Sequence, residues 1–346
     1  MAQPLGRPVE SGGAQPLDPV DAGPTELGAW RGEGVGVGQI LEALGELRRG
    51  EPRAATRTSV VNLVMVADDE EEAERACSAM HRLETGHPGR TIVLVREDEE
   101  AAPRLDAEVS LHGAAAGGHA VWSEDVRLRV RGALGEHLYS LVEPLTLPDV
   151  PVVVWFLTPL PRPSDPVLAA AGFVVVDTKD AADDGSLSRI TALAETHHVM
   201  DLSWIRLQPW RELIGNLFEV KPFRPFLDGI SAVTIQGKAG PRQLMAGWLS
   251  SRLGLPPTAF TLSDARHLVV RLSCEHEGTS GTFTVDRVAG QRLVRSKAEV
   301  EGMAPYEDRL VLHDDSLPWS LGKALARLEP HPSYGPTLRS AVTFAS

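Results

Sequence analysis

The stretch from residue 57 to residue 95 constrains the fold of this chain more than any other. It begins with Arg57–Ala67, a short apolar run rich in valine, which is typical of a strand buried on both faces. Asp68 and Asp69 then suit the N-terminus of a helix, and Thr91–Val95 forms a second apolar strand. A strand, a helix and a strand in this order favour parallel pairing through a right-handed crossover.

Strands and helices continue to alternate through the N-terminal half. The hydrophobic spacing predicts strands at 109–112, 126–130, 152–157 and 173–176, and helices at 37–47, 134–145 and 186–198. This alternation predicts an α/β fold with a mostly parallel sheet.

Two compositional changes divide the chain. Residues 1–27 are rich in Pro, Gly and Ala and bury too little apolar surface to offset chain entropy, so we expect a disordered tail. Lys221–Pro225 contains two prolines that cannot continue a helix, which indicates a domain boundary. The predicted organisation is a tail over 1–27, an α/β domain over 28–222 and a second domain over 223–346.

The second domain is expected to be a smaller α+β unit. Three alternating runs joined by Gly-containing turns predict an antiparallel meander, at 268–274, 282–288 and from 293 onward. A strand at 232–236 and a helix at 241–253 precede it. A further helix at 317–328 is expected to pack on the meander.

Composition excludes several classes of protein. The formal net charge of −13 over 346 residues argues against nucleic-acid binding, which depends on a basic face. No apolar run approaches the roughly 20 residues needed to cross a bilayer, and the N-terminus lacks a secretory signal. The two cysteines, Cys77 and Cys274, fall on apolar faces and are expected to be buried rather than paired. We therefore expect a cytoplasmic protein without a membrane partner.

Patterns for catalysis, metals and cofactors are missing. Gly32, Gly34, Gly36 and Gly38 superficially resemble a dinucleotide loop, but they follow the tail instead of a strand. There is no GxSxG elbow and no HExxH helix. His197–His198 and His313–Asp315 lack an evident third metal ligand. The chain is therefore expected to be no enzyme and to bind neither metal nor cofactor.

One segment stands out as a candidate binding site. Two Trp and two Arg lie between residues 204 and 211, in a chain with seven Trp, and these residue types often carry interface energy. Trp204 and Trp210 either anchor the packing of a domain or also contact a partner, with Trp210 expected to be the more buried because it is in phase with apolar neighbours. Arg206 and Arg211 are the stronger candidates for partner contact.

Two other groups could meet charged partners. Arg127, Arg129 and Arg131 alternate with apolar residues, so they would either protect a sheet edge by charge or contact an acidic partner. His87 and Arg90 lie just before a strand, where they would form either a rigid surface turn or an anion contact.

Four segments in order resemble the glucose-6-phosphate dehydrogenase assembly proteins (OpcA), in particular the actinobacterial type. They are Arg57–Leu63, His87–Ile92, Leu147–Val152 and Asp201–Leu213, and the likeness runs from about Trp30 to near the C-terminus.

The resemblance implies a non-catalytic protein that binds glucose-6-phosphate dehydrogenase and promotes its active oligomer. It would thereby act as an activator in the oxidative pentose phosphate pathway and influence NADPH supply. The thiol-based control associated with the cyanobacterial branch is not expected here, because both cysteines look buried. Two alternatives stay open: a sugar-phosphate or nucleotide-binding α/β enzyme, and a metabolite sensor that passes its signal to the dehydrogenase.

Overall fold

The computed structural model describes residues 25–345 apart from 51–59, 84–88, 117–118, 159, 182–183 and 313–315. Expectations for the tail up to residue 24, the strand start at 57–59, His87 and the His313–Asp315 cluster therefore lie outside the described residues. Residues 25–27, which were assigned to the tail, begin strand β1.

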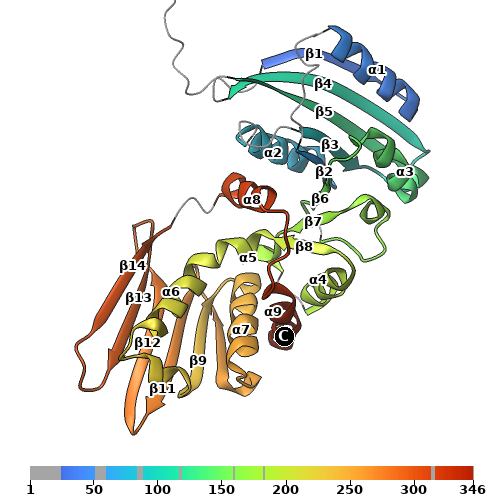
Figure 1. The fold of residues 1–346 in the computed structure, drawn as a ribbon. Helices are drawn as coiled ribbons and strands as arrows, with labels where there is room; N and C mark the ends of the chain where they lie inside the picture. The colour runs from blue at the N-terminus through green and yellow to red at the C-terminus, as the bar shows by residue number, and fades with distance from the viewer. Residues whose placement is uncertain are drawn as a thin grey trace, which may run out of the picture.

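The N-terminal part is built on an eight-stranded sheet in the order β1-β4-β5-β3-β2-β6-β7-β8 (Figure 1). Pairing is parallel from β5 through β8 and antiparallel for β1-β4 and β4-β5, which confirms a mostly parallel sheet. The strands are β1 (Thr25–Gly32), β2 (Val61–Ala67), β3 (Gly89–Arg96), β4 (Arg104–Ala116), β5 (His119–Arg131), β6 (Val152–Phe156), β7 (Phe173–Val176) and β8 (His198–Asp201).

Strand β2 lies in the middle of this sheet and is buried along its whole length. Val64 and Val66 face one hydrophobic cluster, whereas Leu63 and Met65 face another. Side chains alternate between the two faces of a strand, so a strand covered on both faces reads as a continuous apolar run.

The long β4-β5 hairpin differs from the two separate short strands expected there. β4 and β5 pair over their whole length up to Ala116 and His119. The small residues 114–116 belong to strand β4. Strand β5 also lies between β4 and β3, so the expectation of a charge-protected edge at Arg127–Arg131 is wrong.

The second sheet is six-stranded, in the order β10-β9-β11-β12-β13-β14. Strands β11 to β13 form the predicted antiparallel meander, β9 and β14 extend it on its two sides, and β10 adds in parallel to β9. Its strands are β9 (Ile230–Gly237), β10 (Phe260–Asp264), β11 (Val269–His276), β12 (Thr279–Arg287), β13 (Leu293–Val300) and β14 (Tyr306–Val311).

Helices pack against both sheets (Figure 1). α6 packs on β12, β13 and β14, and α7 packs on β9 and α9. The α-helices are α1 (Val37–Gly50), α2 (Glu70–His81), α3 (Leu138–Val142), α4 (Asp184–Thr196), α5 (Leu202–Arg206), α6 (Gln208–Glu219), α7 (Ala239–Leu253), α8 (Leu317–Ala326) and α9 (Tyr334–Ala341).

Helix α8 corrects one expectation. It packs against α2 and α5 on the first sheet, not on the meander. Its apolar residues Leu321 and Ala324 join the cluster that contains Leu63 and Met65 of β2. The end of the chain thus returns to the N-terminal sheet, because that sheet has an apolar face that α2 alone does not cover.

Candidate functional site

The segment with two Trp and two Arg lies where helices from both parts of the chain meet. β8 ends at Asp201, whose carboxylate accepts a hydrogen bond from Ser203 N at 2.8 Å and so caps α5. Trp204 is 3% exposed and Trp210 is 9% exposed. Both indoles are therefore core residues, and Trp204 is the more buried of the two, contrary to the expectation from helical phase.

Arg206 is committed to internal partners. Its guanidinium donates to the Asp177 carboxylate and, at 3.1 Å, to Ser320 Oγ on α8. The ion pair joins α5 to the end of β7, and the hydrogen bond joins α5 to α8. Arg206 is 18% exposed and therefore offers little surface to another protein.

Arg211 has a different environment from Arg206. Its guanidinium stacks over the Trp204 ring at 3.5 Å from the ring centroid and donates to the Trp204 carbonyl oxygen at 2.7 Å. Among the described residues, no carboxylate forms an ion pair with it. Burial consequently lowers the pKa of Arg211 to about 9, opposed by Glu212, so the side chain is charged at neutral pH but poorly compensated.

A buried network anchors this junction. The Asp201 carboxylate accepts hydrogen bonds from Thr178 N, Thr178 Oγ1, Ser203 N and Tyr334 Oη of α9. Burial, and then the negative charge of Asp177, raises the pKa of Asp201 above its usual range. The network ties α9 to the carboxyl end of β8.

The side chains around Arg211 line a cavity of about 540 Å³, which we call the helix-junction pocket. Its walls come from the end of β8, helices α5, α6 and α8, and the loop that leads into α9. Arg211, Lys323, Arg327 and His331 contribute nitrogen donors, whereas Asp201 and Glu329 contribute carboxylates.

The arginines of β5 contact the protein's own acidic helix. Arg127 pairs with Glu70 at 2.5 Å and with Glu74 at 3.0 Å, and Arg129 pairs with Glu70 at 3.3 Å. Although burial opposes it, the hydrogen bond from Arg129 and the charge of Arg127 lower the pKa of Glu70. Arg131 pairs with Glu97. α2 thus supplies carboxylates to Arg127 and Arg129 within the chain, and contact of these arginines with an acidic partner stays a prediction.

Arg90 is an interior residue, not part of a surface turn. Its side chain is 3% exposed and pairs with Glu124 at 2.7 Å, and it also donates to the Leu145 carbonyl oxygen. A long side chain can reach inward from the start of a buried strand. The position of Arg90 next to a turn therefore did not indicate that it pairs inside the protein.

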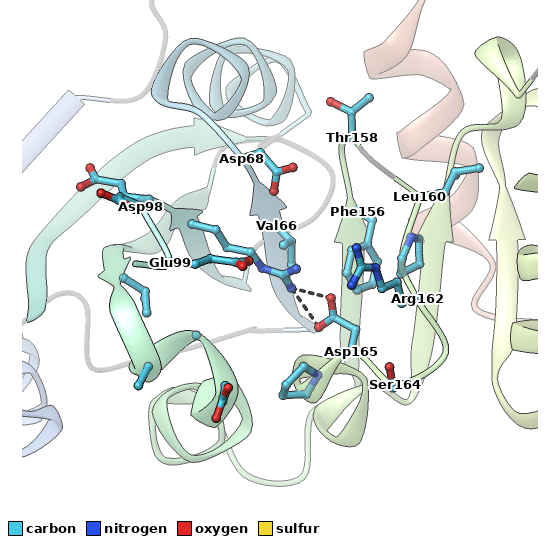
Figure 2. A pocket seen from close by; sticks show the side chains of 18 of the residues that line it. Val66, Asp68, Asp98, Glu99, Phe156, Thr158, Leu160, Arg162, Ser164 and Asp165 are labelled. Carbon is cyan, nitrogen blue, oxygen red and sulfur yellow. Dashed lines mark hydrogen bonds and ion pairs between the residues drawn. The ribbon is translucent and has the colours of Figure 1, made fainter. Parts of the chain in front are cut away.

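A second cavity lies at the carboxyl ends of the parallel strands, in the crevice between β2 and β6 (Figure 2). The order in which strands are added to the sheet changes side at this point: β3, which follows β2 in the chain, lies on one side of β2, and β6 lies on the other. Ligands of α/β sheets usually bind at such a switch point. We call this cavity, of about 980 Å³, the switch-point pocket.

Acidic groups dominate the switch-point pocket. Arg96 pairs with both oxygens of Asp165 at 2.8 and 2.7 Å (Figure 2). Burial raises the pKa of Asp68, opposed by Arg96 and reinforced by Glu99 and Asp165. The acidic lining residues outnumber the basic ones: they are Asp68, Glu97, Asp98, Glu99, Glu136 and Asp165, against Arg96, Arg162 and Arg189.

The N-terminus of α2 at this pocket is already occupied. Asp69 accepts a hydrogen bond from Glu72 N at 2.7 Å, and Glu70, Glu71 and Glu72 fill the first turn. Helix N-termini bind phosphate through free N–H groups and a positive dipole end. These carboxylates take up that favourable position, so the pocket does not suit a phosphate group.

The sequence predicts Asp68 and Asp69 only as candidates for a helix N-terminus, and Asp69 is the cap. Of the two, Asp68 lines the pocket. Thr158, which donates to Glu72, and Asp165 come from the connection after β6. The only sequence feature that pointed to Thr158 and Asp165 was their position after the end of a strand.

Both cysteines are buried and unpaired, as expected. Burial raises the pKa of Cys77 to about 11 and that of Cys274 to about 12. The thiolate is the reactive form, so both are poor nucleophiles at neutral pH. Among the described residues, no group of three or more His, Cys, Asp or Glu side chains is arranged to hold a metal ion.

None of the helices in the described part of the chain is both long and apolar enough to cross a membrane.

Two family profiles match the chain in succession. The glucose-6-phosphate dehydrogenase subunit N-terminal domain of the OpcA assembly family matches residues 80–193, and the C-terminal domain of the same subunit matches residues 197–338. The chain therefore belongs to the OpcA family of glucose-6-phosphate dehydrogenase assembly proteins. Its assignment to the actinobacterial type stays a prediction.

Two curated cyanobacterial relatives are provisionally named OxPP cycle protein OpcA. The protein of Nostoc punctiforme is 27% identical over 158 residues, which is 43% of this chain and 34% of the relative. That of Synechocystis is 24% identical over 147 residues, or 40% of this chain and 31% of the relative. The chain thus matches about a third of the length of these relatives.

A solved structure of an oxidoreductase from Thermotoga maritima resembles the chain weakly. The TM-score is 0.34 at 10% identity, covering 83% of this chain and 94% of that one. This likeness is too low to transfer an activity.

Proposed function

We propose that this protein is a non-catalytic, cytoplasmic assembly factor that binds glucose-6-phosphate dehydrogenase and activates it by favouring its active oligomer. In this role it would regulate entry into the oxidative pentose phosphate pathway and the supply of NADPH. The observation that carries the proposal is the pair of successive family matches over 80–193 and 197–338.

The lining of the switch-point pocket agrees with a binding role. The switch-point pocket has the position of an α/β active site, but its carboxylates and its occupied helix N-terminus disfavour phosphorylated substrates. An activator needs only a higher affinity for the active state of its partner, and a tenfold shift in population corresponds to about 1.4 kcal/mol of differential binding.

The test combines enzyme activity with particle size. Purified dehydrogenase from the same source is titrated with this protein, and NADPH formation and molar mass by light scattering are followed together. We expect both activity and mass to increase to a plateau. A heat-denatured sample of the same protein is the control. A titration that changes neither quantity at concentrations far above any plausible dissociation constant would refute the proposal.

Small-molecule binding at the switch-point pocket is the second candidate function, favoured by the position of that pocket between β2 and β6. It would make the chain an α/β enzyme or a metabolite sensor. Thermal melting with sugar phosphates and nucleotides tests it. From the acidic lining we expect no stabilisation, and a shift that Asp68→Asn changes would instead support this second function.

A further inference from the structure

Arg211 is held in the helix-junction pocket without the counter-charge that comparable arginines have. Arg90 pairs with Glu124, Arg127 with Glu70, and Arg206 with Asp177. Within the described residues, the Arg211 guanidinium has the Trp204 carbonyl oxygen and the Trp204 ring as its contacts, and neither is an anion. A partly buried cation is stabilised strongly only by a negative charge, so this position favours an anionic ligand.

The remaining donors of the pocket lie around the same space. Lys323 on α8, and Arg327 and His331 in the loop before α9, line it together with Arg211. His331 Nδ1 accepts a hydrogen bond from Ser333 N at 3.2 Å, which leaves Nε2 as the donor of the neutral ring. Burial, and then the positive charges of Arg211 and Arg327, lower the pKa of His331. Arg211 and His331 thus present donors to the same space, whereas Arg327 is exposed and paired with Glu329.

Within the described residues, neither of the two carboxylates that line the pocket forms an ion pair with Arg211. Asp201 already accepts four hydrogen bonds, from Thr178, Ser203 and Tyr334. Glu329 pairs with Arg327 at 3.1 Å, and both side chains of that pair are largely exposed. An exposed pair is screened by water and contributes little to the field inside the cavity.

Arg211 and His331 are also held in place before a ligand arrives, whereas Lys323 is exposed and its ammonium lies over the Trp319 ring. The Trp204 ring contacts the Arg211 guanidinium and the rings of His331 and Tyr334. Pro330 and Pro332 flank His331 and restrict the backbone of its loop. Preorganised donors lose little entropy when they bind, which raises affinity for a small ligand.

We propose that the helix-junction pocket is an anion-binding site that takes a carboxylate or phosphate group, with Arg211 as its central ligand and His331 and Lys323 beside it. The volume of about 540 Å³ admits a small phosphorylated or polycarboxylate molecule as well as an acidic side chain of another protein. The site does not depend on the identity of the partner.

Calorimetric titration of the full chain with sodium phosphate and with sodium citrate, at constant ionic strength in chloride, tests the site. We expect saturable binding that Arg211→Gln weakens about tenfold or more, the effect of losing a charge-assisted hydrogen bond. Arg252→Gln, which removes an exposed arginine on α7, is the matched control and should leave affinity unchanged. In NMR spectra, phosphate should shift the imidazole signal that His331→Gln removes.

Melting curves establish that each variant is folded, and Arg211→Lys, which keeps the charge but loses the planar fork, provides a second variant. Its affinity should fall by several-fold. If neither anion binds, the same variants are titrated against the dehydrogenase. Weaker binding by Arg211→Gln but not by Arg252→Gln then identifies the anion as an acidic side chain of that enzyme.

The outcomes distinguish failure of the anion site from failure of the proposed assembly function. Anion binding that is equal in the native protein and in Arg211→Gln, or no effect of Arg211→Gln on any of the three ligands, overturns the site. Phosphate or citrate binding through Arg211 without any binding of the dehydrogenase supports the site and counts against the assembly function.

Discussion

The switch-point pocket and the helix-junction pocket differ in position and in charge. The first lies where α/β folds usually bind phosphorylated ligands, yet carboxylates line it and Asp69 occupies its helix N-terminus. The second lies at no conventional ligand position, yet it holds an arginine without a carboxylate partner among the described residues and two further cations. Charge and hydrogen-bond capacity therefore locate an anion site in this protein better than fold position does.

The walls of the two pockets should also differ in what they contribute to stability. Trp204 is buried in the core and carries the Arg211 guanidinium, so Trp204→Ala should lower the free energy of unfolding by about 3–5 kcal/mol. Leu160→Ala at the half-buried edge of the switch-point pocket should cost about 1 kcal/mol. Urea unfolding of both variants measures the difference. Equal losses would show that Trp204 is not a core anchor.

The two arginines of α5 and α6 should respond differently to substitution. Arg206→Ala leaves the largely buried Asp177 with only the more distant Lys179, at 3.9 Å, and should cost about 2–3 kcal/mol. Arg211→Gln removes a poorly compensated charge and should change stability by no more than about 1 kcal/mol in either direction. Paired denaturation curves check this contrast. A larger loss from Arg211→Gln than from Arg206→Ala would mean that the Trp204 stack is mainly structural.

The carboxylates of the two pockets should differ in pH dependence. Burial raises the pKa of Asp201 above its ordinary value of 3.8, so the folded state binds this proton more tightly than the unfolded state does. Its contribution to stability is then greatest below pH 3.8 and is lost as pH rises through the folded pKa. Urea titrations between pH 4 and 7 should show a steeper loss in the native protein than in Asp201→Asn.

Asp68 provides the comparison for that measurement. It is less buried and is opposed by Arg96, so Asp68→Asn should change the slope of stability against pH less than Asp201→Asn does. A larger change at Asp68 would reverse the ranking of the two carboxyl groups.

The smallest expected effect is at the exposed arginine of the switch-point pocket. Arg162→Gln should leave the affinity for phosphate and citrate unchanged, because the neighbouring carboxylates repel both anions. Calorimetry under the conditions used for Arg211→Gln measures it. A loss of affinity comparable with that of Arg211→Gln would place an anion in the switch-point pocket as well.

Local patterns were sufficient to predict most individual elements. The continuous apolar run of β2, the alternation in β11 to β13 and the helix at 241–253 all follow from side-chain period, which depends on nearby residues only. The same patterns predicted buried cysteines correctly. They could not predict that β4 and β5 form one long hairpin, because the alternation of side chains within a strand does not determine which strand pairs with it.

The chemistry of the site depended on contacts that are distant in sequence. The sequence alone determined the α/β class, the absence of familiar catalytic motifs and the family, since each rests on local residue order. Tertiary structure decided that Arg206 pairs with Asp177 whereas Arg211 lacks a carboxylate partner among the described residues, although they lie on adjacent helices. It also brought His331 and Lys323 beside Arg211 by returning α8 to the first sheet. An arginine's role follows from its counter-charge, and only the folded chain determines which counter-charge lies within reach.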